Sequence, residues 1–205
     1  MSRSRSRGWF QKHSRDTYVR QAQAANYRAR SAFKLAEIDE REKLFRPGQT
    51  IVDLGAAPGS WSQYVAEKVQ PGGRVLAIDR LEIKPIDGVS LIHGDLEDPA
   101  VVEKIRDWLA GRPADLVISD AAPNLTGIAV TDQANMAALG RLLVGLCPAT
   151  LKPGGHFLIK LFQGDELAAY VEELREHFRT VVTRKPAASK DTSREVYVLG
   201  RGYNV

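Results

Sequence analysis

The sequence predicts an α/β fold, in which a mostly parallel seven-stranded sheet with one antiparallel strand carries helices on both faces. From residue 50 nearly to the end, short apolar runs typical of buried strands alternate with stretches of helical periodicity. This alternation favours a parallel sheet, because parallel strands are joined by helical crossovers. The last two expected strands have no helix between them, so one of the two should run antiparallel to its neighbours.

The expected strands are short, rich in Val, Ile and Leu, and bounded by Gly, Pro or charged residues. They are Thr50–Leu54, Arg74–Asp79, Val89–His93, Ala114–Ser119, Gly155–Phe162, Thr180–Thr183 and Glu195–Leu199.

The expected helices place apolar residues at helical spacing and end near Gly or Pro. For example, Leu139 and Leu143 share one face of a helix, and Pro47-Gly48 follows the first helix. The helices are Ser31–Glu42, Trp61–Val69, Pro99–Leu109, Asp132–Cys147 and Glu166–Phe178.

Length and composition favour one globular domain. The chain has 205 residues, and its apolar runs are far too short to span a bilayer. A single cysteine, Cys147, excludes an internal disulfide framework and a cysteine-based zinc cluster, and we expect it to be a small buried apolar residue. We therefore expect a cytoplasmic monomer without a metal or membrane association.

Positive charge is concentrated at the N-terminus. Residues 1–36 contain nine Lys or Arg and one acidic residue, whereas the remainder contains 20 basic and 24 acidic residues. A basic segment gains free energy by displacing counterions from phosphates. We predict a basic RNA-binding arm over residues 1–30, disordered at its start in the free protein, and a single domain over residues 31–205.

The turn after the first strand has the composition of a ligand-binding turn. Gly55 permits a tight turn, and Gly59 lets the backbone approach a ligand near a helix N-terminus. Such a turn alone is a weak signal, but Asp79 ends the second strand 20 residues after Gly59. An acidic residue at this place accepts hydrogen bonds from the ribose hydroxyls of an adenosine.

Dinucleotides and S-adenosylmethionine both suit this geometry. Pro58 removes an amide donor that a pyrophosphate would use, and Asp53 and Asp120 suit the cationic groups of S-adenosylmethionine. The residues therefore favour S-adenosylmethionine. Asp95 follows the third strand, where it either accepts from the adenine amine or serves as an acidic residue before the helix at Pro99.

The segment Ser119–Asn124, after the fourth strand, bears on the acceptor atom. It lacks the Pro-Pro-aromatic pattern of exocyclic-amine methyltransferases and the cysteine of cytosine-C5 enzymes. Lys160 lies in a strand that is apolar on both faces, where a lysine is costly unless it is paired or deprotonated. It is either held for chemistry beside Asp120 or reaches solvent from an edge strand. A positioned amine could remove the proton of a ribose hydroxyl as the methyl group transfers.

Two further charged residues suit the same site. Lys34 falls in the first turn of its helix if Ser31 caps that helix, and it could be either a second cation near Lys160 or a surface lysine. Glu195 opens the last strand. If that strand is antiparallel, its start lies beside the carboxyl ends of the others, where open α/β sheets bind ligands.

With these residues in view, the chain resembles the FtsJ-like family of ribosomal RNA 2′-O-methyltransferases over nearly its whole length. The matching segments are Trp9, Tyr18-Val19, Arg30–Leu35, Val52–Gly59, Ser119-Asp120 with Ala122–Asn124, Lys160 with Phe162–Gly164, and Ser193–Tyr197. The resemblance implies a Rossmann-like class I methyltransferase fold that binds S-adenosylmethionine and methylates a uridine ribose in the A-loop of 23S ribosomal RNA in the large subunit.

The resemblance also implies roles for single residues. A catalytic tetrad would be Lys34, Asp120, Lys160 and Glu195. Contacts with the cofactor would fall on Gly59, Trp61, Asp79, Asp95 and Asp120. To these contacts we add Asp53, Gly55 and Ser60, the last because it replaces a glycine common in the family and could change how the turn sits on the methionine carboxylate.

Two questions stay open at this level. Related branches methylate tRNA or mRNA caps, and a non-catalytic RNA-binding assembly factor on the same scaffold is the competing class. Lys160 either accepts the proton of the hydroxyl or only orients its lone pair.

Overall fold

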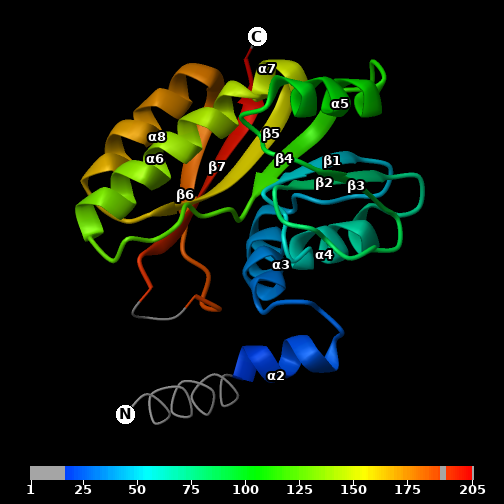
Figure 1. Ribbon diagram of the computed structural model, residues 1–205, viewed down its shortest axis with the longest axis horizontal. Helices are drawn as coiled ribbons and strands as arrows, with labels where there is room; N and C mark the ends of the chain where they lie inside the picture. The colour runs from blue at the N-terminus through cyan, green and yellow to red at the C-terminus, as the bar shows by residue number, and fades with distance from the viewer. Residues whose placement is uncertain (1–16, 190–192, 205) are drawn as a thin grey trace.

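The computed structural model describes residues 17–189 and 193–204, which form one seven-stranded sheet in the order β3-β2-β1-β4-β5-β7-β6 (Figure 1). The strands are β1 Thr50–Leu54, β2 Arg74–Asp79, β3 Val89–His93, β4 Ala114–Ser119, β5 Leu151–Phe162, β6 Phe178–Arg184 and β7 Glu195–Tyr203. Strand β7 is antiparallel to both β5 and β6, and the other pairs are parallel. The predicted sheet is confirmed, and β7 is its antiparallel strand.

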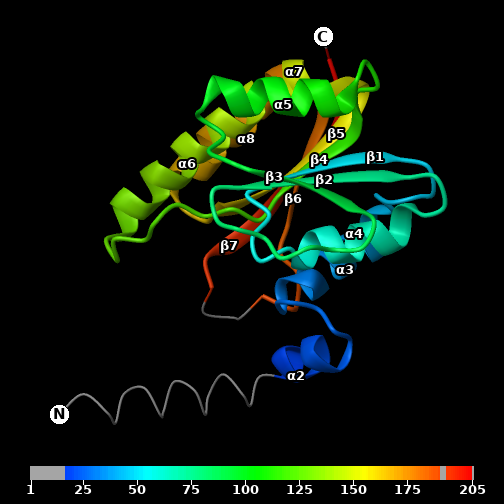
Figure 2. The ribbon, with the colours of Figure 1, turned by 45° about the vertical axis from the view of Figure 1, so that its right-hand side comes forward.

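Helices cover both faces of the sheet (Figure 2). They are α2 Thr17–Ala24, α3 Ser31–Glu42, α4 Ser60–Val69, α5 Pro99–Leu109, α6 Ala129–Gly145, α7 Cys147–Thr150 and α8 Asp165–His177. One apolar cluster lies between the sheet and helices α3 and α4. The other lies on the opposite face of the sheet and includes residues of helices α5, α6, α7 and α8. Cys147 is fully buried in the second cluster, as predicted.

Every side chain of β1 is buried, because this strand is central and covered on both faces. Ile51 belongs to the α3–α4 cluster, and Val52 and Leu54 belong to the opposite cluster. Side chains alternate along a strand, so Asp53 points toward α4, where it accepts a hydrogen bond from Ser62. The strand thereby carries one polar group to the edge where the turn at Gly55 begins.

Several predicted boundaries are wrong by a few residues. Strand β5 begins at Leu151 rather than Gly155, because a register irregularity lets Leu151 pair with Ala114. Helix α6 begins at Ala129 rather than Asp132, because the Asp132 carboxylate accepts from Thr126 in the preceding loop instead of capping the helix.

At the C-terminal end, helix α8 stops one residue earlier than predicted, since Phe178 takes an extended backbone and pairs with Tyr203. Strand β7 runs on beyond Leu199 to Tyr203 because it pairs with β6 along its length. Gly200 is required there, since a Cβ at this position would lie 2.6 Å from the Phe178 ring.

The end of the predicted basic arm contains a helix that the sequence pattern did not indicate. Helix α2 lies against α3, with the Tyr18 ring 5.9 Å from the Phe33 ring and the Tyr18 hydroxyl donating to Glu37 (Figure 1). The rest of the predicted arm, residues 1–16, lies outside the described residues. The boundary at residue 30 stays a prediction. No helix within residues 17–189 and 193–204 is long and apolar enough to cross a membrane.

Candidate active site

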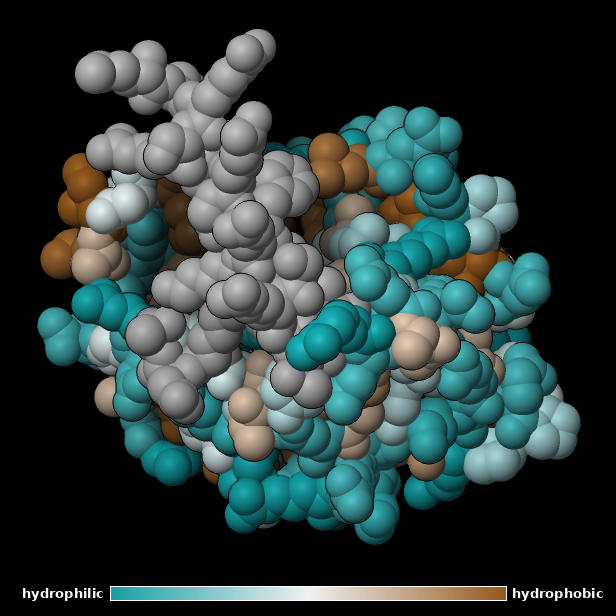
Figure 3. Space-filling view, turned by 90° about the horizontal axis from the view of Figure 1, so that it is seen from below, coloured by the Kyte–Doolittle hydropathy of each residue, from teal (hydrophilic) through white to brown (hydrophobic). Residues whose placement is uncertain are grey.

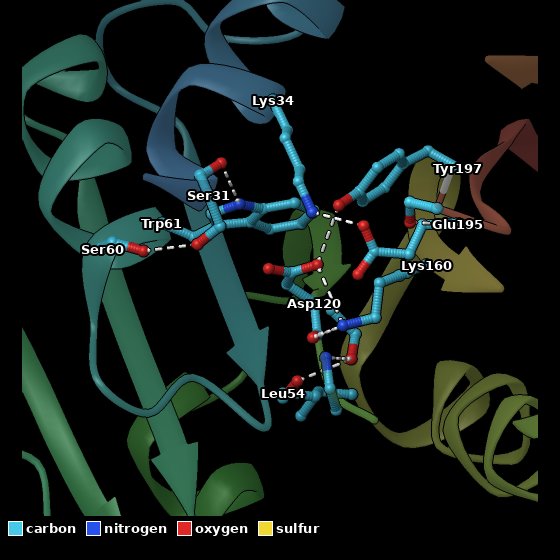
Figure 4. Close-up of polar contacts among 12 residues, drawn as sticks. Ser31, Lys34, Leu54, Ser60, Trp61, Asp120, Lys160, Glu195 and Tyr197 are labelled. Carbon is cyan, nitrogen blue, oxygen red and sulfur yellow. Dashed lines mark hydrogen bonds and ion pairs between the residues drawn. The ribbon is translucent and has the colours of Figure 1, made fainter. Parts of the chain in front are cut away.

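Four charged side chains meet where the carboxyl ends of β4 and β5 lie beside the start of β7 (Figure 4). Asp120 follows β4 directly, Lys160 lies near the end of β5, and Glu195 opens β7 opposite Phe162. Lys34 reaches the same place from α3. These are the four residues expected to form a catalytic tetrad, and the structure brings them together although 161 positions separate Lys34 from Glu195.

Lys160 is a buried lysine held by one neighbour. Its Nζ donates to the backbone carbonyl of Asp120 at 2.5 Å and lies 3.3 Å from the Asp120 carboxylate. The side chain is 8% exposed, and β5 lies between β4 and β7. The edge-strand alternative for Lys160 therefore does not hold, and its amine is fixed beside Asp120.

Lys34 and Glu195 form a second ion pair, in which the lysine is buried, the carboxylate is 24% exposed, and Nζ and Oε2 lie 2.6 Å apart. Burial alone would raise the pKa of Glu195, but the hydrogen bond and charge of Lys34, together with the charge of Lys160, hold this pKa below its usual value. Glu195 is therefore a carboxylate at neutral pH. Its charge balances two lysines that would otherwise repel each other across the site.

The expected capping of α3 by Ser31 is wrong. Arg30 is the N-cap residue and makes no side-chain cap, while Ser31 begins the helix and shares a 2.8 Å hydrogen bond with the Ser60 hydroxyl. Lys34 still falls in the first turn. The macrodipole disfavours a positive charge at the start of a helix, so the carboxylate of Glu195 is needed to stabilise the ammonium of Lys34 there.

Tyr197 is a residue of this site that the sequence argument missed. Its hydroxyl donates to Asp120 Oδ1 at 2.9 Å, and its ring is fully buried, 5.7 Å from that of Trp61. Burial, and then the charges of Asp120 and Glu195, hold the pKa of Tyr197 well above its usual value, so the hydroxyl stays neutral and donates. The signal was its place two residues after Glu195, which puts both side chains on one face of the strand.

A cavity of about 470 Å³ opens beside this cluster. Four of the predicted cofactor residues line it: Gly55, Asp79, Asp95 and Asp120. Both carboxylate oxygens of Asp79 accept backbone N–H groups, from Ala57 and Leu81, which fixes the carboxylate at the cavity wall. Gly55 has φ of +70°, and a Cβ there would lie 2.4 Å from that of Ala121, so the turn requires glycine.

Gly59, Ser60 and Trp61 do not line this cavity. Gly59 has φ of +101° and is the N-cap residue of α4. Ser60 and Trp61 are buried and bonded to Ser31, the indole nitrogen donating to its carbonyl at 2.9 Å. The hydrogen bonds of Ser60 and Trp61 thus hold the turn after β1 against α3.

Asp53 does not line the cavity either. It is 1% exposed, its Oδ2 accepts from Ser62 at 2.6 Å, and its Oδ1 has no hydrogen-bond partner among the described residues. Burial raises the pKa of Asp53 to about 7; the Ser62 hydrogen bond opposes this rise, and the charges of Asp120 and Asp79 add to it. Asp53 is thus an incompletely satisfied acid behind the cavity.

Comparison with known proteins decides the family. The model of the FtsJ-like methyltransferase family matches residues 27–203, which is nearly all of the chain. The chain belongs to the FtsJ-like methyltransferase family. The family assignment, and with it the Rossmann-like fold of S-adenosylmethionine-dependent methyltransferases, agrees with the expectation from sequence.

Individual relatives of this FtsJ-like protein span its whole length. It is 49% identical to the ribosomal RNA large subunit methyltransferase E of Chromobacterium violaceum, over 98% of this chain and 99% of that protein. The methyltransferase of the same name from Azoarcus sp. is also 49% identical, over 95% of each. A crystal structure described as a ribosomal RNA methyltransferase of Plasmodium falciparum superposes with a TM-score of 0.80 at 27% identity, over 86% of this chain and 98% of that one. Fibrillarin of Aeropyrum pernix, solved with S-adenosylmethionine, shares the fold, with a TM-score of 0.60 at 16% identity over 83% and 76%.

The cavity of this FtsJ-like chain fits S-adenosylmethionine. Asp79 is pinned at the end of β2, where an adenosine ribose would meet it, and each of its oxygens keeps a free lone pair. Asp95 also lines the cavity, while the cap of α5 is made by Asp98, whose carboxylate accepts from Ala100. Asp95 is therefore not needed as a helix cap, and its carboxylate is exposed at the wall.

Proposed function

We propose that this FtsJ-like enzyme transfers a methyl group from S-adenosylmethionine to a ribose 2′-hydroxyl of large-subunit ribosomal RNA, at a uridine in the A-loop of 23S RNA. The observation that carries the proposal is the pairing of the buried Lys160 with Asp120, which lines the cavity, next to a second pair of Lys34 and Glu195. The names of the relatives from Chromobacterium violaceum and Azoarcus sp. support the choice of RNA.

The proposed mechanism is an in-line displacement at the ribose oxygen. When bound, S-adenosylmethionine supplies an activated methyl group, and Gly55, Asp79, Asp95 and Asp120 are the residues that would hold it. As the 2′-oxygen becomes a nucleophile, a neutral Lys160 amine receives its proton, whereas an ammonium at this position only orients the hydroxyl. Asp120 fixes that amine through its carbonyl and its carboxylate, so that little reorganisation accompanies the transfer.

The second ion pair positions the sugar. Lys34 donates to Glu195, and the carboxylate remains charged because the lysine lowers its pKa against the effect of burial. A carboxylate and an ammonium fixed beside Lys160 and Asp120 offer an acceptor and a donor to ribose hydroxyls. Tyr197 takes no part in the proton transfer and holds Asp120 in place.

The test is the chemical identity of the product. We expect the purified enzyme, given labelled S-adenosylmethionine and unmodified large-subunit RNA or subunits, to yield 2′-O-methyluridine on nuclease digestion and mass spectrometry. Lys160→Met should abolish transfer, and Lys104→Met, an exposed lysine on α5, should not. Methyl groups found on a base, or only on tRNA or mRNA caps, would refute the proposal.

Lys160→Arg separates the two roles of the amine, because arginine stays protonated and cannot accept a proton. We expect its activity to fall by orders of magnitude across the pH range. Activity near that of the wild type would exclude Lys160 as the base and leave it only the orientation of the hydroxyl.

The N-terminal arm, residues 1–30, is proposed to bind the phosphates of the RNA, because it concentrates positive charge that counterion release favours. A monomer acting in the cytoplasm, where a ribosomal substrate is found, completes the proposal. Deleting residues 1–16 should weaken RNA binding and reduce its salt dependence without changing the affinity for S-adenosylmethionine.

A further inference from the structure

The loop between β4 and α6 and the first turn of α6 expose large apolar side chains beside the active site. Among the described residues, Leu125, Ile128 and Val130 are 62%, 63% and 76% exposed. Within the described residues, the only other large apolar side chains that are more than a third exposed are those of Leu81 and Leu91. Figure 3 shows apolar side chains gathered at one edge of the molecule, on the side where the N-terminal end of α6 lies in Figure 1.

Hydrogen bonds fix the backbone of this loop. The Asp132 carboxylate accepts from the amide and hydroxyl of Thr126, at 2.7 and 2.8 Å, and from the amide of Gly127. The Thr126 hydroxyl in turn accepts from the amide of Ile128. The backbone and hydroxyl hydrogen bonds of Thr126 hold the pKa of Asp132 below its usual value, so the carboxylate that organises the loop is charged at neutral pH.

The loop also borders the place where the acceptor must enter. The segments on each side of it, Asp120 to Asn124 before it and Asn135 onward after it, line the cavity. Gly164, four residues after Lys160, leaves room for Gln133 of α6, since a Cβ at Gly164 would lie 2.3 Å from that side chain. The exposed apolar residues thus lie in a segment bounded by Asn124, which lines the cavity, and by Gln133, which packs at Gly164 just after β5.

A cation accompanies them. Arg80, an exposed residue that also lines the cavity, donates to Asn124, the residue before Leu125, at 3.4 Å. An apolar surface next to a guanidinium fits a ligand that combines flat apolar faces with negative charge. Nucleic acid has both, in its bases and its phosphates.

We infer that Leu125, Ile128 and Val130 form an apolar wedge that packs against the bases next to the acceptor nucleotide and holds that nucleotide out of its stack. The inference rests on the proposed function. The Lys160 side chain is only 8% exposed, so the acceptor ribose has to enter the site away from its stacked neighbours. Apolar side chains inserted between bases replace part of the stacking that is lost.

Steady-state kinetics on RNA tests the wedge. We expect Leu125→Ser and Ile128→Ser each to raise KM for the RNA about tenfold, which corresponds to about 1.4 kcal/mol. The Kd for S-adenosylmethionine should not change. Leu125→Met and Ile128→Leu should behave like the wild type, and so should the control Leu91→Ser on β3. Thermal unfolding of each variant verifies that it is folded.

Cross-linking identifies the occupant directly. Cys147 is buried, so Ile128→Cys offers a single accessible thiol among the described residues for a photoactivatable label. In a mixture with large subunits we expect the label to cross-link to RNA near the methylated nucleotide, and a label at Leu91→Cys to give no such product.

The outcomes are distinct. Serine variants that match Leu91→Ser, a parallel loss of affinity for S-adenosylmethionine, or cross-links to ribosomal protein would each overturn the wedge while the wild type still methylates RNA. A wild type that transfers no methyl group to RNA would instead refute the proposed function, and the wedge with it.

Discussion

Replacing Asp53 with asparagine should stabilise the protein at neutral and alkaline pH. Asp53 is 1% exposed, and within the described part of the chain only one of its carboxylate oxygens has a hydrogen-bond partner, Ser62. Burial raises its pKa from the ordinary value of 3.8 to about 7. Between these two pH values the folded state binds a proton that the unfolded state has released, so the contribution of Asp53 to stability falls as the pH rises.

The magnitude follows from the two pKa values. Each pH unit between them is worth about 1.4 kcal/mol, so ionisation of Asp53 costs the folded state about 4 kcal/mol at pH 8. At pH 5 the cost is only about 1.5 kcal/mol, because the folded state is still protonated there. The asparagine variant does not titrate, and the cost of burying its amide, about 1–3 kcal/mol, is the same at both pH values.

Urea denaturation at several pH values isolates the contribution of Asp53 ionisation to stability, because the cost of burying the asparagine amide does not change with pH. The free energy of unfolding of Asp53→Asn minus that of the wild type should increase by about 2.5 kcal/mol from pH 5 to pH 8. Ser62→Ala is the matched control, since it removes the partner and leaves the carboxyl group to titrate. A difference that stays constant across this pH range would refute the assignment of a buried, high-pKa acid to position 53.

Three further predictions concern the residues around the site. Glu195→Gln should lower the free energy of unfolding by about 3–5 kcal/mol at neutral pH, because it leaves the buried ammonium of Lys34 without its counter-charge. Urea denaturation of the double variant that also carries Lys34→Met should show that most of this loss is recovered. Tyr197→Phe should cost about 1.5–3 kcal/mol of stability, the value of a hydrogen bond to a charged group, yet keep far more methyl transfer than Lys160→Met in single-turnover assays. Arg28 donates hydrogen bonds to three backbone carbonyls, one of which belongs to Pro58 in the turn after β1. Calorimetry should therefore show weaker binding of S-adenosylmethionine to Arg28→Ala. Arg28→Lys should not restore the affinity, because a single ammonium lacks the planar fork of a guanidinium.

Local patterns predicted most of the fold. Strand β1 is buried on both faces, and its mostly apolar run of five residues, interrupted by Asp53, already indicates that burial. Helix α2 was missed because a helix of eight residues has little stability of its own and depends on contacts with α3, such as that of Tyr18 with Phe33. The start of α6 was misplaced because Asp132 suits a helix start but serves the loop before it.

The site was harder to predict than the fold, because its geometry depends on pairing between distant segments. The burial of Lys160 followed from its own strand, whereas its opposite neighbour, Tyr197, is set by the antiparallel register of β5 and β7. A buried tyrosine in a strand reads as core, and only the structure shows its hydroxyl on Asp120. Likewise, the sequence placed Lys34 and Glu195 each at the site and the family resemblance grouped them in a tetrad, but only the structure shows that they pair with each other.

The acid behind the cavity also links binding to protons. Asp120 and Asp79 line the cavity and already raise the pKa of Asp53, so a cationic ligand among these acids should lower it. Asp53 is largely protonated below pH 7 in the free protein, and binding of S-adenosylmethionine at pH 6.5 should therefore release a fraction of a proton that approaches zero above pH 8. Calorimetry in buffers of different ionisation enthalpy counts that release, and Asp53→Asn provides the baseline for protons that come from the ligand itself. Equal release by the two proteins would mean that the cation does not sense Asp53, and the acid would then be only a cost to stability, not part of cofactor binding.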